Sequence, residues 1–143
     1  MPELSWSLNP QLAADTVPVG EMELSRLLLA TDANYPWLLL VPRRPGLTEL
    51  IDLEENAQVK LLGEIALAAR VLKSATACDK LNIAALGNVV AQLHVHVIAR
   101  STRDPAWPKP VWGAMPPAVY EPATRDRLLD ALRRGLQLAP LRD

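Results

Sequence analysis

The chain has 143 residues, of which 50% are apolar and 22% charged, with a formal net charge of −1. This length favours one domain spanning residues 1–143. The near-neutral charge argues against nucleic-acid polymers and membrane surfaces as partners, because both require an excess of Lys and Arg. No apolar run approaches the ~20 residues of a membrane span, and no signal peptide is visible. The lone Cys78 cannot form an intramolecular disulfide, which favours a reducing, cytoplasmic location.

Short apolar runs and longer amphipathic stretches alternate along the chain. Apolar runs bounded by proline or polar residues predict strands, and apolar residues at helical spacing predict helices. The expected strands are Glu21–Thr31, Trp37–Val41, Asn82–Leu86 and Gln92–Ile98, and the expected helices are about Glu54–Ser74 and about 122–138. Because the links between strands are short, the sequence predicts an α+β fold, a small antiparallel sheet with one long helix and a C-terminal helix.

Proline clusters divide this single domain into parts. We expect a core at about 16–104, a segment rich in Pro and Trp at 105–122, and the C-terminal helix after it. Proline donates no backbone hydrogen bond, so its clusters should form turns, edges or extended segments. Asp52 and Glu55 have the spacing of a capping box, which predicts that Asp52 caps the long helix.

The most informative segment is the predicted strand that contains Gln92, His94 and His96. These three residues alternate with apolar residues, and the chain has no other histidine. Because strand side chains alternate between faces, the apolar residues should enter the core and the other three should share the opposite face.

Three interpretations of this polar face compete. It can be a solvated surface without a function. It can be a metal site, although zinc usually needs three or four protein ligands, so Asp or Glu would have to complete the set. It can also catalyse phosphoryl or nucleotidyl transfer, since a neutral imidazole is a nucleophile at pH 7 and a second, protonated imidazole neutralises phosphate oxygens.

The segment Gly87–Arg100 (GNVVAQLHVHVIAR) resembles the signature of the histidine-triad (HIT) proteins. That signature is a Gly-Gln pair followed by three histidines that alternate with apolar residues. The resemblance covers about Leu24–Arg103 and includes the segment WLLLVPRR. Gln92 stands in place of the first histidine, Asn88 in place of the usual Gln, and Ala99 in place of the usual Pro.

The resemblance implies a nucleotide hydrolase or nucleotidyl transferase that acts at the α-phosphate without a metal or other cofactor. His94 would be the nucleophile and would form a covalent nucleotidyl-histidine. His96 would contact the phosphate under attack, and Gln92 would donate one neutral hydrogen bond. Since Gln92 cannot transfer a proton to the leaving group, the alternative is a nucleotide-binding protein with little or no turnover. A metal-binding or purely structural module is a third, separate hypothesis.

Further site residues follow from the same resemblance. Asn88 and Gly87 would contact the phosphate, and Asn82 would hold the phosphate loop by side-chain hydrogen bonds. Asp32 would bind the ribose hydroxyls, and we prefer it slightly over Asn34.

The resemblance also implies a homodimer that pairs through the long helix and a strand. In the family, the segment after the triad shapes leaving-group specificity. For Trp107 and Trp112, which lie in this segment, we favour the simpler interpretation that both side chains cover an exposed end of the sheet.

Overall fold

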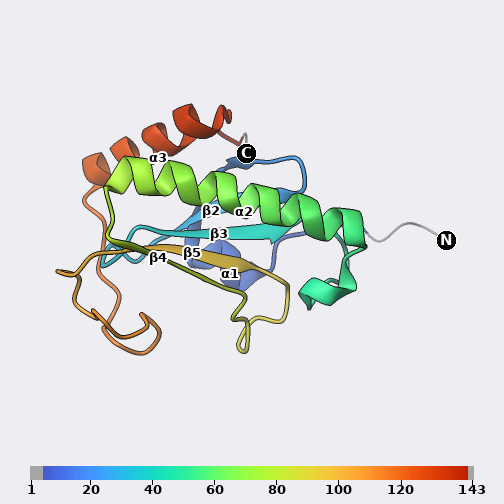
Figure 1. The fold of residues 1–143 in the computed structure, drawn as a ribbon, viewed down its shortest axis with the longest axis horizontal. Coiled ribbons are helices and arrows are strands. Elements are labelled where there is room, and N and C mark those ends of the chain that lie inside the picture. The colour runs from blue at the N-terminus through green and yellow to red at the C-terminus, as the bar shows by residue number, and fades with distance from the viewer. Residues whose placement is uncertain (1–4, 142–143) are drawn as a thin grey trace.

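The computed structural model describes residues 5–141. Its five strands form one antiparallel sheet in the order β1-β2-β3-β5-β4 (Figure 1). The elements are α1 (Pro10–Ala14), β1 (Thr16–Glu21), β2 (Ser25–Ala30), β3 (Trp37–Pro42), the 3-10 turn η1 (Leu50–Asp52), α2 (Glu55–Thr76), β4 (Lys80–Ala84), β5 (Val95–Arg100) and α3 (Pro122–Leu136). The predicted α+β class is confirmed. None of the helices within residues 5–141 is long and apolar enough to cross a membrane.

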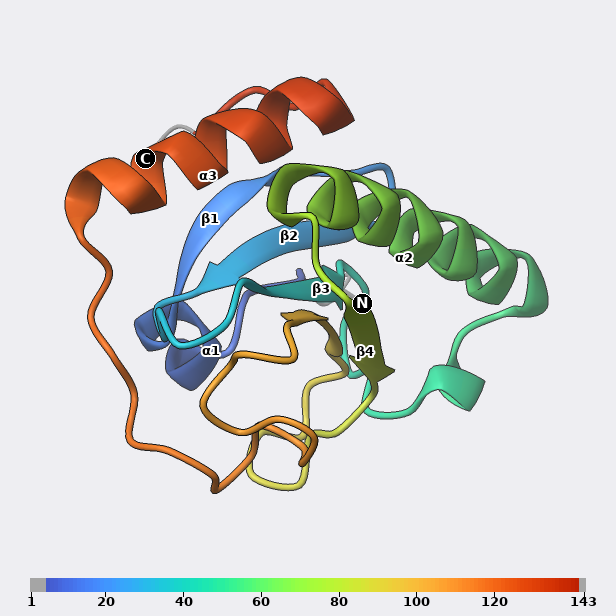
Figure 2. The same ribbon diagram turned by 60° about the vertical axis from the view of Figure 1, so that its left-hand side comes forward.

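The helices lie on both faces of the sheet. Helices α2 and α3 cover one face, and the short α1 lies on the other (Figure 2). Because strand side chains alternate, Leu38 and Leu40 of β3 belong to the core beneath α2 and α3, whereas Leu39 and Val41 pack with Leu12 of α1. Strand β3 is therefore buried on both faces, as its continuous apolar run predicts. Each such leucine contributes roughly 1.5–3 kcal/mol through burial.

The first hairpin differs from the prediction, because the segment Glu21–Thr31 belongs to two strands and not to one. The turn between β1 and β2 is held by the buried carboxylate of Glu64 on α2, which accepts hydrogen bonds from the main-chain N–H groups of Leu24 (2.8 Å) and Ser25 (3.0 Å). Strand β1 contains Pro18, which is tolerated because β1 is an edge strand. The turn is thus stabilised by the distant side chain of Glu64, and the local sequence contains no turn signal.

The predicted cap of the long helix was wrong. Helix α2 begins at Glu55 with Glu54 in the capping position. The carboxylate of Asp52 accepts hydrogen bonds from Glu49 N (2.9 Å) and Thr48 Oγ1 (3.1 Å) instead. Asp52 therefore closes the preceding 3-10 turn.

Strand β5 begins at Val95, three residues later than Gln92, where the prediction had placed its start. Leu93 leaves the strand ladder because its N–H donates to the carbonyl of Leu47 (2.9 Å). Leu93 and Val95 still pack in the core on the α2 side. His94 therefore remains on the opposite face of the sheet, although it lies in the connection before β5.

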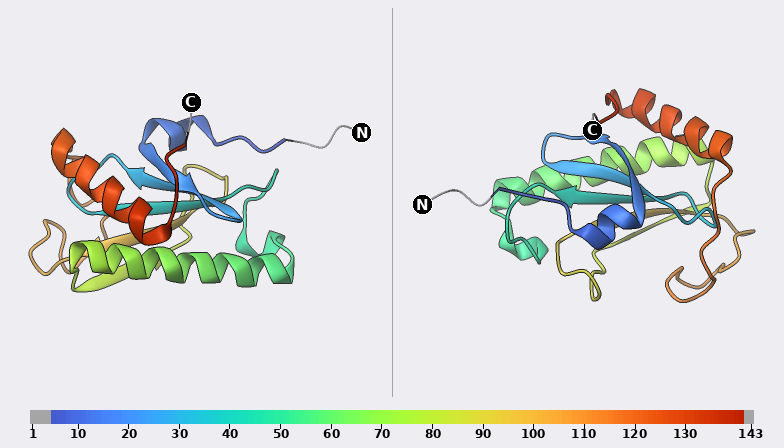
Figure 3. Two further views of the ribbon diagram at one scale, coloured as in Figure 1. Left: turned by 90° about the horizontal axis from the view of Figure 1, so that it is seen from above. Right: turned by 180° about the vertical axis from the view of Figure 1, so that it is seen from behind.

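The C-terminal helix agrees with the prediction. Leu129, Leu132 and Leu136 of α3 are buried in the core shared with α2 and the sheet. Gly135 permits the close contact between the two helices, since a Cβ atom there would lie 2.5 Å from Cγ1 of Val71. Seen from above, α3 lies beside α2 (Figure 3).

Candidate active site

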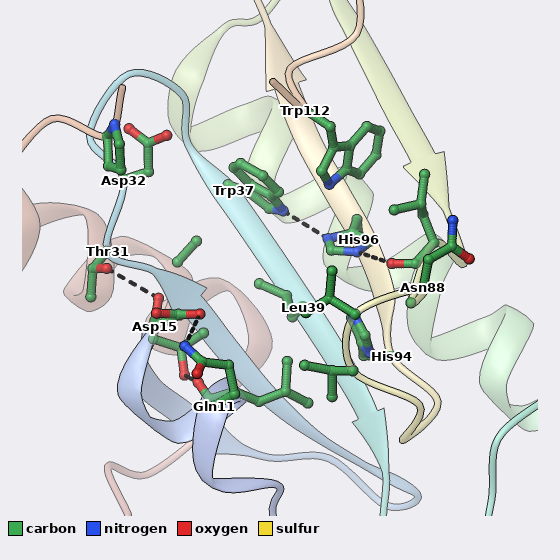
Figure 4. Close-up of a pocket in the computed structure, with 18 residues that line it drawn as sticks. Gln11, Asp15, Thr31, Asp32, Trp37, Leu39, Asn88, His94, His96 and Trp112 are labelled. Carbon is green, nitrogen blue, oxygen red and sulfur yellow. Dashed lines mark hydrogen bonds between the residues drawn. The ribbon is translucent and has the colours of Figure 1, made fainter. Parts of the chain in front are cut away.

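A pocket of about 450 Å³ opens on the α1 side of the sheet, where β3 and β5 are neighbours (Figure 4). Its walls come from α1, the end of β2, strands β3 and β5, the loop between β4 and β5, and the segment that follows β5. Residues that line it include Gln11, Leu12, Asp15, Thr31, Asp32, Trp37, Leu39, Gly87, Asn88, His94, His96 and Trp112. Among the described residues that line the pocket, none is Lys or Arg.

His94 has one defined tautomer. Its Nδ1 lies 2.7 Å from the main-chain carbonyl oxygen of Gln92. A carbonyl oxygen only accepts, so Nδ1 carries the proton, and the neutral ring keeps a lone pair on Nε2. Gly87 lies directly against this ring, because a Cβ atom at position 87 would be 3.0 Å from Cε1 of His94 and 2.7 Å from the carbonyl oxygen of Val90. The glycine thus lets the loop approach the imidazole.

His96 is held neutral, in contrast to the protonated imidazole that we expected. The indole Nε1 of Trp37 donates to Nδ1 (3.0 Å), so Nε2 carries the hydrogen and donates to the carbonyl of Leu86 (2.8 Å). Burial lowers the pKa of His96 from 6.5 to about 4, and the nearby His94 adds to this effect, while the Leu86 carbonyl opposes it. His96 therefore offers neither a charge nor a free N–H to a ligand.

Lowering the pH should therefore destabilise the protein through His96. The unfolded chain binds a proton near pH 6.5 and the folded chain only near pH 4, so the free energy of unfolding falls as the pH drops between these values. The loss should reach about 3 kcal/mol at the lower end. Urea unfolding at a series of pH values measures it. In a His96→Gln variant the pH dependence over this range should be much smaller, and an unchanged pH dependence would contradict this assignment.

Gln92 does not line the pocket that contains the two histidines, although it lies with His94, Gly87 and Asn88 around a smaller hollow beside it. Its Oε1 accepts a hydrogen bond from Asn9 N (2.8 Å), and its Nε2 donates to the carbonyl of Ser7 (2.9 Å). The amide that we expected to donate to a substrate is therefore bonded to the N-terminal segment. The link between Gln92 and His94 runs through the Gln92 main-chain carbonyl, which any residue type could supply.

Asp32, which we expected at the ribose, is one of the residues that line the pocket. Its Oδ1 accepts hydrogen bonds from the main-chain N–H groups of Asn34 (2.9 Å) and Ala118 (3.1 Å). Within residues 5–141, its Oδ2 has no hydrogen-bond donor and remains available. The side-chain amide of Asn34 instead donates to the carbonyl of Pro116 (2.8 Å), which ties down the segment that leads to α3.

Of the residues expected at the phosphate, Gly87 and Asn88 line the pocket and Asn82 does not. The Oδ1 of Asn82 accepts a hydrogen bond from the buried guanidinium of Arg100 (2.8 Å), so Asn82 does not hold the loop as we expected. Main-chain N–H groups at positions 87–92 donate to no acceptor within the described part of the chain. The loop can therefore present N–H donors to an anion.

The two tryptophans of the segment after β5 have different positions. The ring of Trp112 lies 5.1 Å from that of His96 and 5.9 Å from that of Trp37, both in edge-to-face geometry. Trp107 lies elsewhere, with its ring 5.7 Å from the guanidinium carbon of Arg100. Trp112 therefore packs on the strands, as expected of a side chain that covers the sheet, and it also forms a wall of the pocket.

Sequence reasoning missed α1, which forms the wall opposite the histidines (Figure 4). Gln11 and Asp15 of this wall are joined by a hydrogen bond from Nε2 to Oδ2 (2.9 Å). A signal for the helix was present in the adjacent residues Asn9 and Pro10. Asn9 accepts a hydrogen bond from Gln11 N as the N-cap, and Pro10 occupies the first helical position.

The metal-site interpretation finds little support in the geometry. Across residues 5–141, no three His, Cys, Asp or Glu side chains come close enough together to hold a metal ion. The two imidazoles are adjacent, with ring centroids 4.9 Å apart, but both nitrogens of His96 are already bonded within the protein. One imidazole nitrogen is an insufficient ligand set for zinc.

A five-stranded antiparallel sheet with a long helix across it, and two histidines at the start of an inner strand, define a protein of the histidine-triad fold. The chain belongs to the HIT domain family, whose model matches residues 11–103. No curated protein matches the sequence.

Solved structures of HIT proteins are similar over nearly the whole chain. A histidine triad protein from Bradyrhizobium japonicum is 55% identical, with a TM-score of 0.91 over 92% of this chain and 98% of that one. One from Marinobacter aquaeolei VT8 is 42% identical, with a TM-score of 0.90 over 95% and 100%. One from Sinorhizobium meliloti 1021 is 39% identical, with a TM-score of 0.88 over 91% and 96%.

Proposed function

We propose that the protein is a nucleotide hydrolase or nucleotidyl transferase that cleaves at the α-phosphate through a covalent nucleotidyl-His94 intermediate. One observation carries this proposal, the hydrogen bond from Nδ1 of His94 to the Gln92 carbonyl. This bond keeps the proton on Nδ1 and leaves the Nε2 lone pair for attack, in a residue that lines the pocket. It also stabilises the positive charge that the ring acquires when Nε2 bonds to phosphorus.

The reaction has two steps. In the first, Nε2 of His94 bonds to the α-phosphorus, and the bond between phosphorus and the leaving group breaks with its electron pair on the leaving group. In the second, water attacks the same phosphorus, the bond to Nε2 breaks, and the imidazole regains its lone pair. The products are a nucleoside monophosphate, the leaving group and the proton released by water.

Dipoles stabilise the phosphate oxygens in this proposal. No Lys or Arg is among the described residues that line the pocket, so the donors are the Asn88 amide and the main-chain N–H groups of the loop at 87–92. Fixed N–H donors of this kind stabilise developing negative charge when they are aimed at it in advance. His96 supports the loop through the Leu86 carbonyl, and Asp32 accepts a hydrogen bond from a ribose hydroxyl through its available oxygen.

The proposed mechanism selects substrates by their leaving group. General acid catalysis typically contributes 10²–10⁴-fold, and neither Gln92 nor the neutral His96 can supply a proton. The favoured substrates are therefore nucleotides whose leaving group departs as a stable anion, such as those joined by a phosphoanhydride bond. Substrates with an amine leaving group should react more slowly.

Incubation with a dinucleoside polyphosphate and with adenosine phosphoramidate tests the proposal, with AMP as the detected product. We expect AMP from both, faster from the polyphosphate, and a nucleotidyl adduct in the mass spectrum of rapidly quenched enzyme. Binding of AMP without turnover would favour the second candidate, a nucleotide-binding protein. That candidate is supported by the hydrogen bonds that the Gln92 amide and His96 form within the protein, because neither side chain is then free to assist the reaction.

The proposed assembly is a homodimer, and the proposed location is the cytoplasm, which suits the lone Cys78. Strand β4 is the last in the sheet order and carries Ile83, which is 51% exposed. Val59 and Leu62 of α2 are 68% and 67% exposed. Pairing of these surfaces would bury apolar area and complete the edge of the sheet. Sedimentation equilibrium should give twice the chain mass of 15.7 kDa.

A further inference from the structure

The side chain of Gln92 joins the site to a part of the chain that is remote in sequence. Its amide pairs with two main-chain groups, the N–H of Asn9 and the carbonyl of Ser7, at 2.8 and 2.9 Å. These partners lie 83 and 85 residues before Gln92. An amide has its donor and acceptor side by side, so it can bond to alternate residues of an extended segment as a neighbouring strand would.

An imidazole cannot reproduce this pairing. The two ring nitrogens of histidine diverge, so they cannot both reach an N–H and a carbonyl that are two residues apart on the same segment. A histidine at position 92 would leave at least one of these main-chain groups without its partner. Gln92 therefore performs a task that the histidine usual at this position of the signature could not.

The segment held by Gln92 leads directly into the pocket wall. Asn9, whose N–H bonds to Gln92, caps α1 by accepting a hydrogen bond from Gln11 N (2.8 Å). Helix α1 then places Gln11, Leu12 and Asp15 in the pocket. A chain of hydrogen bonds thus connects the Gln92 amide to this wall.

We infer that Gln92 is a positioning residue, which docks the segment at 7–9 and thereby fixes α1 as a wall of the ligand pocket. Its side chain acts on ligand binding through α1 and takes no part in the chemical step, to which Gln92 contributes only its main-chain carbonyl. An imidazole at this position would therefore weaken binding and would not raise turnover. The kinetic part of this inference rests on the proposed function, whereas the docking part can be measured without any substrate.

Hydrogen exchange tests the docking. In Gln92→Met, which keeps the side-chain length but loses both hydrogen bonds, and in Gln92→His, amides at positions 5–16 should exchange roughly tenfold faster than in the unmodified protein. Amides of β3 should be unaffected. The matched control is Gln58→Met on α2, which removes a glutamine hydrogen bond to the Leu53 carbonyl outside the pocket. Exchange at 5–16 that is unchanged in both Gln92 variants would overturn the inference.

Steady-state hydrolysis of a dinucleoside polyphosphate tests the link to binding. We expect KM to rise about three- to tenfold in both Gln92 variants and kcat to stay within about twofold. A fall in kcat at constant KM in Gln92→Met, or a rise in kcat in Gln92→His, would overturn the positioning role. If the unmodified protein neither binds nor hydrolyses nucleotides, the proposed function fails, while the exchange experiment still decides whether Gln92 docks the segment.

Discussion

Replacement of His94 by alanine should reduce nucleotide hydrolysis by about 10⁴-fold or more, because the variant lacks the atom that bonds to phosphorus. The loss should appear in kcat and in the covalent adduct alike. In the unmodified protein Nδ1 of His94 is bonded to the Gln92 carbonyl, so Nε2 is the attacking nitrogen. In the variant, both nitrogens of His96 are still bonded within the protein, so no imidazole nitrogen within residues 5–141 can take over the attack.

The His94→Ala experiment needs a measure of ligand binding beside the rate. Asp32, Asn88 and the loop N–H groups remain in the variant, so the affinity for AMP should change by less than about tenfold, and calorimetry can measure it. If the variant lost affinity for AMP as well as the hydrolysis rate, the pocket would have collapsed. A variant that hydrolyses the substrate at the original rate would exclude attack by His94.

The largest expected effect on stability follows from replacing Asp104 by asparagine. The Asp104 carboxylate accepts two hydrogen bonds from Arg100, at 2.7 and 3.1 Å, and the Arg100 side chain is only 2% exposed. Burial alone would raise the pKa of the Asp104 carboxyl, but the hydrogen bonds from Arg100 and from the N–H groups of Ser101 and Ala106 keep it below its ordinary value. The variant leaves a buried guanidinium without a counter-charge, which should cost about 3–5 kcal/mol.

Urea unfolding measures this loss, and the chain provides a matched control. Arg125 and Asp126 form an ion pair with side chains 38% and 62% exposed. Asp126→Asn should change the free energy of unfolding by less than about 1 kcal/mol, because solvent screens the pair. Equal effects of the two substitutions would show that the Arg100–Asp104 pair contributes no more than a surface pair.

The Asp104→Asn variant should also affect the pocket. Asp104 accepts hydrogen bonds from the main-chain N–H groups of Ala106 (3.1 Å) and Trp107 (2.8 Å), and the same segment carries Trp112 against His96. A reduced nucleotide affinity in this variant would fit a wall displaced together with its segment.

Elements with a strong local pattern were predicted well from the sequence. The apolar run of β3 and the helical spacing of leucines in α3 are visible locally, because burial selects their side chains residue by residue. The β1–β2 turn could not be predicted in this way. Its N–H groups are satisfied by Glu64, a carboxylate that lies 39 and 40 residues further along the chain.

The sequence by itself determined that two histidines lie at one strand and that their apolar neighbours face the core, because the period of a strand is two residues. Only the tertiary structure decided what each polar side chain does there. Burial keeps His96 neutral, and the indole of Trp37 donates to its Nδ1. The main chain of Ser7 and Asn9 engages the Gln92 amide, and α1 closes the pocket. These outcomes depend on hydrogen-bond partners that are far away in the sequence, and no local pattern encodes which partner a side chain meets.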